Sequence, residues 1–222
     1  MYTIPLFPLD TVLFPGAPIY LHIFEPRNRM MMRRCLDESQ PFGVVLIRRG
    51  QESGDSLAEP VRVGCSARIT EVTPLEDGQM NLIALGDDRF RILTLNYDLP
   101  YLVGNVEGLP LERTHSLEII RGLRRLVPYI KKYLRQIDAL EGEKTLDLSK
   151  LELPEDPLAL LNLSAALLQV PPAEKQPLLE AVDARDLLAQ VTRLYRRETA
   201  LIHRTLENQA GEQAYQKAAG LN

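Results

Sequence analysis

Apolar and polar residues alternate along residues 61–70, and this period of two predicts a strand with one face in a core and one face in water. The alternation slips near Glu71, because Val72 falls on the opposite phase, and a β-bulge at this point accounts for the slip. Residues 76–79 read Glu-Asp-Gly-Gln and predict a tight hairpin turn, since Asp and Gly tolerate positive φ angles. The chain is then expected to return as a strand through Met80.

Two further segments of the first half have strand patterns. Residues 40–47 form a nearly continuous apolar run, which predicts a strand buried on both faces. Residues 89–92 read Arg-Phe-Arg-Ile, and we expect this strand to direct both arginines outward. The preceding pair, Asp87 and Asp88, is interpreted as a turn rather than as paired catalytic carboxylates, because adjacent residues of a strand point to opposite faces.

The first half also contains one helix and one polar loop. Pro26 suits the first turn of a helix, which we expect to continue to Leu36. Residues 49–56 are polar and contain two glycines, so they predict an exposed loop. Several short strands separated by Gly and Pro turns predict a small barrel or closed sheet over residues 1–112.

From residue 114 the apolar positions follow a helical period. Their spacing of three and four predicts one long helix, and Pro128 inside it should kink or split that helix. The seam consists of Ile120, Leu123, Val127, Ile130, Leu134 and Ile137. Residues 141–156 have a weak pattern and are expected to form a linker.

Two aspartates mark the starts of later helices. Asp156 precedes Pro157, which predicts an N-cap followed by a proline in the first helical position. Asp183 is expected to cap the last long helix, whose inward residues should be Leu187, Val191, Leu194, Leu201 and Ile202. The chain is therefore predicted to be an α+β protein, with the barrel over residues 1–112 and an α-helical bundle over residues 113–222.

Composition narrows the function classes. The chain has 222 residues, with 26 Lys and Arg against 30 Asp and Glu, so its net charge is -4 and it lacks the overall basic charge typical of nucleic-acid binders. The cysteines, Cys35 and Cys65, stand apart from each other and from any His cluster, which favours buried thiols in a reducing cytoplasm over a zinc site. Prolines interrupt the N-terminal apolar run, and no apolar stretch is long enough for a membrane span.

Motifs for catalysis and cofactor binding are missing from the sequence. It contains no GxSxG, no GxxxxGK[ST] and no GxGxxG, and nothing places a nucleophile beside a base. The three histidines, His22, His115 and His203, are scattered. We therefore expect no enzyme activity, no cofactor and no metal.

Two stretches are candidates for binding. Basic residues along the long helix, with Arg121, Arg125 and Lys132 on one face, could contact RNA phosphates, but only Tyr129 shares that face and could stack on a base. We favour an ordinary solvated face there. The run Met30, Met31 and Met32 offers flexible apolar side chains, at least one of them exposed, for adaptable binding.

The alternative is that these methionines fill gaps in the core under the sheet, and the sequence favours it at least as strongly as a binding role. If the methionines do form a binding surface, Met31→Glu should weaken binding without unfolding the domain. A groove between the two halves is the other expected binding surface, because clefts between domains are common ligand sites.

Four segments resemble one known family. Residues 4–16 (IPLFPLDTVLFPG) closely resemble the start of the Lon protease N-terminal domain family, which typically has P-L-x-P-L followed by V-x-F-P-G. Residues 63–69 resemble its V-G-T-x-A-x-I strand, residues 86–92 its G-x-x-R-F-R-I strand, and residues 174–180 its E-K-Q-x-L-L-E segment. In order, the matches span roughly residues 3 to 205.

This resemblance implies a PUA-like β subdomain followed by a helical bundle. It also implies a role in holding substrate polypeptides, because in full-length Lon this region helps recognise them. The 222 residues contain no ATPase or Ser-Lys protease motif, so neither activity is carried over. The expected function is a non-catalytic module that binds unfolded or tagged polypeptides and could act as an adaptor for a protease. The alternative is an RNA-binding PUA-like protein.

Overall fold

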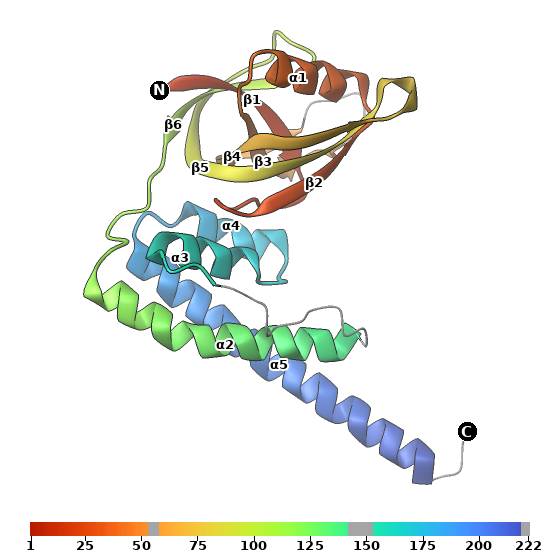
Figure 1. The fold of residues 1–222 in the computed structure, drawn as a ribbon, viewed down its shortest axis with the longest axis vertical. Coiled ribbons are helices and arrows are strands. Elements are labelled where there is room, and N and C mark those ends of the chain that lie inside the picture. Colours follow the sequence, from red (N-terminus) through yellow and green to blue (C-terminus); the bar gives the residue numbers. More distant parts are fainter. Residues whose placement is uncertain (53–57, 142–152, 219–222) are drawn as a thin grey trace.

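The computed structural model describes residues 1–52, 58–141 and 153–218. Six strands form a barrel with helix α1 at its upper end, and the helices of the second half lie below it (Figure 1). The strands are β1 (Tyr2–Leu9), β2 (Pro18–Ile23), β3 (Phe42–Arg49), β4 (Glu59–Pro74), β5 (Met80–Asn96) and β6 (Leu102–Gly108). The helices are α1 (Pro26–Asp37), α2 (Leu117–Glu141), α3 (Pro157–Ala166), α4 (Pro172–Glu180) and α5 (Ala184–Ala218). The predicted α+β class, with a barrel before a helical bundle, is confirmed.

Strand β5 pairs with three other strands of the barrel, β2, β4 and β6. The sheet order is β2-β5-β4-β3-β1-β6, and a further pairing between β5 and β6 closes it. The predicted bulge is present, because the register of β4 against β5 shifts between Ile69 and Glu71. The predicted hairpin turn is also present, with φ angles of 62° at Asp77 and 72° at Gly78. These features were predictable because they depend on residues close together in the sequence.

The interpretation of Asp87 and Asp88 as a turn is wrong. Both residues lie inside β5, which runs without interruption from Met80 to Asn96, beside a register shift in β4 between Cys65 and Ala67. The expectation that Arg89 points outward is also wrong, because only 6% of this residue is exposed. The irregular register next to Arg89 explains why simple alternation fails there.

The helical half confirms the predicted caps. The Asp156 carboxylate accepts a hydrogen bond from the Ala159 backbone N–H at 2.7 Å, and the Asp183 carboxylate accepts one from the Arg185 N–H at 2.7 Å. Pro128 does not split α2, which is one helix from Leu117 to Glu141. Leu201 is exposed rather than inward. Of the expected linker, residues 142–152 lie outside the described part of the chain, as do residues 53–57 of the expected polar loop.

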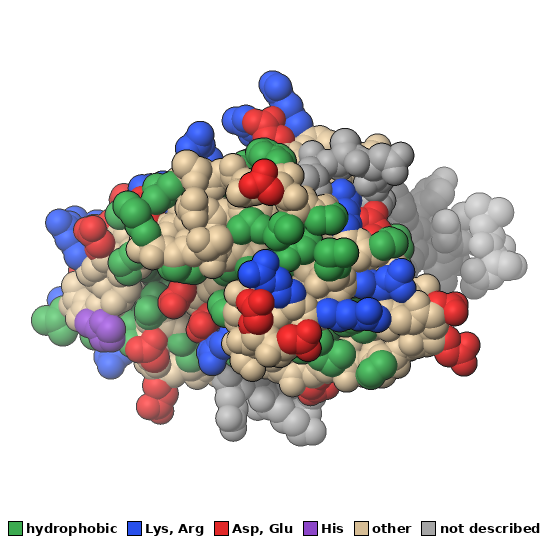
Figure 2. Space-filling model, turned by 90° about the horizontal axis from the view of Figure 1, so that it is seen from above, with side chains coloured by type: hydrophobic (Ala, Val, Ile, Leu, Met, Phe, Trp, Pro, Cys, Tyr) green, Lys and Arg blue, Asp and Glu red, His purple; other side chains and the backbone are tan. Residues whose placement is uncertain are grey.

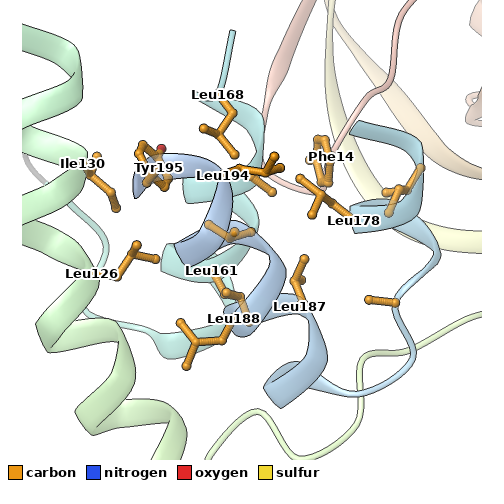
Figure 3. Close-up of a cluster of buried hydrophobic side chains, with 14 of the residues drawn as sticks. Phe14, Leu126, Ile130, Leu161, Leu168, Leu178, Leu187, Leu188, Leu194 and Tyr195 are labelled. Carbon is orange, nitrogen blue, oxygen red and sulfur yellow. The ribbon is translucent and has the colours of Figure 1, made fainter. Parts of the chain in front are cut away.

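The largest hydrophobic cluster joins the two halves. It consists mainly of residues from α2, α3, α4 and α5, but Val12, Phe14, Leu46 and Val63 of the first half belong to it. Figure 3 shows Phe14 beside Leu178 of α4. The segment carrying Phe14 is held against β5 at Gly86, where a Cβ atom would lie 2.3 Å from the Phe14 carbonyl oxygen. The division at residues 112 and 113 stays a prediction, since the core crosses it.

Buried polar contacts also join the halves. Arg89 of β5 donates hydrogen bonds from Nη1 to the carbonyl oxygens of Leu179, at 2.9 Å, and Ala181, at 2.5 Å. Gln176 of α4 donates from Nε2 to the carbonyl oxygen of Val63 in β4, at 3.0 Å. Both side chains are buried. These contacts fix α4 against the barrel, because a buried donor without a partner would cost about 1–3 kcal/mol.

Candidate functional site

The three candidate methionines lie in different environments on α1. Met31 and Met32 are fully buried in a core cluster beneath the helix, together with Cys35, whereas Met30 is 53% exposed. Met31→Glu would therefore place a carboxylate in the core, and the expectation that the domain stays folded with this substitution is wrong. Among the three, Met30 is the side chain that a partner can contact directly.

The face around α1 is mixed rather than apolar. Viewed from above, it shows basic and acidic side chains scattered among hydrophobic ones (Figure 2). Arg29 of α1 donates a hydrogen bond to the Asp77 carbonyl oxygen at 2.6 Å, which ties the helix to the β4–β5 hairpin. Met30 thus offers one exposed apolar side chain on an anchored helix, and its role in binding stays a prediction.

A hollow in the surface lies at the point where strands β4 and β5 separate. The pairing of β4 with β5 ends where Val63 lies opposite Arg91. Beyond that point β4 pairs with β3, with Pro60 opposite Ile47, while β5 pairs with β6, with Ile92 opposite Val106. The two strands that form a hairpin at one end therefore diverge at the other.

We call the space between the diverging ends the strand-edge groove. It measures about 730 Å³ and is lined by residues 59–63, residues 91–95, Tyr97, Arg48 and Glu180. Glu180 is the last residue of α4, so the groove lies where barrel and helical half meet. The rest of its lining belongs to the barrel, so the expected groove between the two halves stays a prediction, and the parting of β4 and β5 was not predicted. Each strand was recognisable from its own alternation, whereas the point of divergence depends on which strands pair.

The groove combines apolar surface with charges of both signs, from three arginines and two glutamates. Val61, Leu93 and Leu95 are half-buried, and Tyr97 is exposed. Arg48 forms an ion pair with Glu59, and Arg91 forms one with Glu107 at 3.5 Å. Such a lining suits a ligand held by backbone hydrogen bonds and apolar side chains rather than by net charge.

The titratable groups outside the strand-edge groove lie in surroundings that suit a structural role. Burial raises the pKa of the Cys35 thiol to about 11 and that of Cys65 to about 12, so both thiols stay protonated and poorly nucleophilic at neutral pH. The prediction of buried thiols is confirmed. His22 lies 2.7 Å from the Asn81 side-chain oxygen through Nδ1. Among the described residues, no group of three or more His, Cys, Asp or Glu side chains is placed to hold a metal ion.

The basic residues singled out on α2 separate in the structure. Arg121, Arg125 and Tyr129 line a hollow between α2 and α5, whereas Lys132 does not line it. No described helix is both long enough and apolar enough to cross a membrane.

Comparison with known protein families identifies the family to which the chain belongs. Residues 3–197 match the model of the "ATP-dependent protease La (LON) substrate-binding domain". The chain belongs to the Lon substrate-binding domain family. The predicted resemblance is thereby confirmed over nearly the whole chain.

Curated relatives and solved structures agree with this assignment. Lon protease 2 of Myxococcus xanthus is 29% identical over 203 residues, which are 90% of this chain and 24% of that protein. The chain therefore spans about a quarter of that relative's length. The Lon N-terminal domain protein from Xanthomonas campestris matches with a TM-score of 0.58 and 26% identity, over 86% of this chain and 97% of that one. The N-terminal domain of the Mycobacterium avium complex Lon protease shares the fold, with a TM-score of 0.66 and 20% identity, over 88% of this chain and 98% of that one.

The segments that resemble the Lon family meet at the junction of the two halves. Phe14 comes from the first segment, Val63 from the second, Arg89 from the third, and Gln176 and Leu179 from the fourth. Their shared task in this Lon substrate-binding domain is to hold the barrel against the helices. The motifs that reveal the family are therefore mainly structural, and the binding surface has to be found from the geometry.

Proposed function

We propose that this chain is a non-catalytic polypeptide-binding module that holds an extended segment of a client protein in the strand-edge groove. The divergence of β4 from β5 beyond Val63 and Arg91 is the observation that carries the proposal. A strand whose neighbour departs has backbone N–H and C=O groups that a third strand can pair with. Addition of a peptide strand to such an edge is a recurrent mode of polypeptide recognition.

This mode suits clients of varied sequence. Main-chain hydrogen bonds do not depend on side-chain identity, so an edge can accept any unfolded segment that adopts an extended conformation. The apolar side chains of Val61, Leu93 and Tyr97 would add affinity by burying alternate side chains of the client.

The cellular role that follows is that of an adaptor in protein quality control or regulated proteolysis. A module that holds unfolded or tagged polypeptides, and that acts without cutting them, would need a protease as its partner. The compartment we propose is the cytoplasm, in line with two reduced, buried thiols.

Hydrogen exchange tests where the client binds. The probe is reduced, carboxymethylated α-lactalbumin, which stays unfolded, and amide exchange is measured with and without it. We expect slower exchange at residues 61–62 and 93–95, because a paired backbone N–H is protected. Protection confined to α1 would overturn the groove and favour the surface around Met30.

A matched pair of variants tests the same proposal by affinity. Tyr97→Ser removes an exposed ring from the groove, and Tyr20→Ser removes an exposed ring from β2 outside it. We expect Tyr97→Ser to weaken capture of the same unfolded probe about tenfold, the usual scale for losing one interface aromatic, with Tyr20→Ser close to wild type. Equal effects of the two substitutions would contradict the proposal. Met30→Ser in the same assay tests the second surface.

A further inference from the structure

A second hollow lies between α2 and α5, on helices that do not form the strand-edge groove. It measures about 700 Å³, and we call it the arginine groove because five of its lining residues are arginines. These are Arg121 and Arg125 of α2 and Arg185, Arg193 and Arg196 of α5. All five are exposed. The acidic residue of the lining is Glu118.

Close packing of the two helices forms the floor of the groove. At Gly122 of α2, a Cβ atom would lie 2.3 Å from Cδ2 of Leu188 in α5, so the absence of a side chain lets the helices approach. Leu188 and Ala189 contribute apolar surface to the floor. The two rows of arginines rise from opposite walls of this narrow seam, so a ligand lying along it meets guanidinium groups on both sides.

The helices run in the same direction along the groove. Glu118 near the start of α2 forms an ion pair with Arg185 near the start of α5, at 2.8 Å, and Arg196 lies over the Tyr129 ring further along both helices, 5.5 Å from its centroid. Both helix N-termini therefore lie at one end of the groove. Since a helix N-terminus carries partial positive charge, the helix dipoles add to the attraction for anions there.

The charge of this groove stands out against a chain of net charge -4. Within the described residues, Arg121, Arg125 and Arg193 form no ion pair, and Glu118 offsets a single arginine. Arginine stays protonated in proteins, so the charge persists at any physiological pH. The Glu118–Arg185 pair also shows that a carboxylate fits against a guanidinium in this space.

We propose that the arginine groove binds an acidic segment of another polypeptide. Carboxylates of the segment pair with Arg121 and Arg125 on one wall and with Arg193 on the other, and an apolar side chain of the segment lies over Leu188 and Ala189. A guanidinium receives a carboxylate through two parallel hydrogen bonds, which gives such a site both affinity and orientation.

The observations favour a polypeptide over RNA. Sequence-tolerant binding of single-stranded RNA uses aromatic rings on which bases stack. Tyr129 is the aromatic residue of this lining, and Arg196 already covers one face of its ring. The apolar floor between the arginine rows suits an aliphatic side chain, for which a sugar-phosphate backbone has no counterpart.

Fluorescence anisotropy with the full chain tests this site. The probe is a fluorescein-labelled peptide of repeated Glu-Glu-Leu-Glu units, compared with the same peptide carrying Gln in place of Glu and with an oligouridylate of similar length. The groove variant is Arg121→Gln/Arg125→Gln. The matched control is Arg124→Gln/Lys131→Gln, which removes two exposed charges of the same helix outside the groove.

We expect the acidic peptide to bind and the Gln peptide not to bind. The groove variant should raise the Kd for the acidic peptide at least about tenfold, since charge-assisted hydrogen bonds are lost, while the control changes it less than about twofold. Arg193→Gln is a second variant, from the opposite wall, with the same expected direction. Circular dichroism confirms that each variant is folded.

Three results would overturn the proposal. The first is equal affinity for the acidic and the Gln peptide, and the second is an equal loss of acidic-peptide affinity in the groove variant and the control variant. The third is tighter binding of the oligouridylate than of the acidic peptide, with that oligouridylate binding lost in the groove variant. The last result would assign the site to nucleic acid. Tyr97→Ser should leave acidic-peptide binding unchanged, so failure here is distinguishable from failure of the strand-edge groove.

Discussion

Arginines occupy two opposite situations in this molecule. At the junction of barrel and helices, Arg89 is buried and donates to the carbonyl oxygens of Leu179 and Ala181. In the arginine groove, Arg121 and Arg125 are exposed, with guanidinium groups directed to a hollow. The same side chain thus fixes the architecture in one region and remains available to a ligand in the other.

Burial decides which of the two roles an arginine takes. Desolvation lowers the pKa of Arg89, which measures how unfavourable the surroundings are for its charge. The carbonyls of Leu179 and Ala181 compensate for part of that loss of hydration through Nη1, whereas Nη2 has no hydrogen-bond partner among the described residues. The exposed arginines keep their hydration and depend on no partner. We therefore expect substitutions at the junction to affect stability, and substitutions in the groove to affect binding.

The largest loss of stability is expected for Phe14→Ala. This side chain joins the first half of the chain to the helical core beside Leu178, and its removal leaves a cavity that the two halves cannot easily fill. Truncation of a buried Phe typically costs about 3–5 kcal/mol. Urea unfolding followed by circular dichroism measures it. A loss below about 1 kcal/mol would show that the junction does not depend on this contact.

Arg89→Ala should cause the second-largest loss of stability, about 3 kcal/mol. Two hydrogen bonds from a charged donor are lost, and two carbonyl oxygens are left buried without that donor. The control is Arg91→Ala, two residues along the same strand, which removes an ion pair of 3.5 Å near the surface and should cost less than about 1 kcal/mol. Both are measured by urea unfolding. Similar losses for the two variants would remove the contrast between the buried and the exposed arginine.

Gly122→Val should destabilise by about 2 kcal/mol, because its new side chain meets Leu188 and forces α2 away from α5. Ala139→Val, at an exposed position of the same helix, is the control and should change stability by less than about 0.5 kcal/mol. Thermal unfolding gives both values. If Gly122→Val is neutral, the close approach is not what shapes the floor of the arginine groove.

The smallest effect on stability is expected for Arg121→Gln/Arg125→Gln. Surface substitutions away from caps and buried networks usually stay within about 0.5 kcal/mol of the parent protein. Urea unfolding of this variant should therefore overlay that of the wild type. A loss comparable to that of Arg89→Ala would mean that these arginines are structural, and the distinction between the two regions would fail.

Local features of the fold could be predicted from the sequence. The turn at Asp77 and Gly78, the bulge near Glu71 and the Asp156 cap each depend on residues a few positions apart. The change from a period of two to a helical period near residue 114 predicted the order of barrel and helices, and the family resemblance agreed with it. Both kinds of prediction rest on patterns that are complete within one segment.

Features created by distant segments were missed. The alternation around Arg89 gave no sign that carbonyl groups ninety positions later would bury this side chain. Leu201 has the spacing of a core residue but is 49% exposed, because its burial depends on which other segments pack against α5. The basic face of α2 was visible in the sequence, yet the facing arginines of α5 were not, because nothing local specifies which helix faces meet. Both grooves belong to this second class.

The pairing of β1 with β6 has a consequence for the order of events during synthesis. Tyr2 lies opposite Val106, so the first strand of the chain lacks one of its two neighbours until roughly a hundred more residues have been made. At about 5–20 residues per second, that interval lasts roughly 5–20 s. Phe14 lacks its contact in the helical core for longer still, until Leu178 emerges. A module proposed to capture unfolded chains is thus itself an unfolded chain with a half-paired first strand during part of its own synthesis.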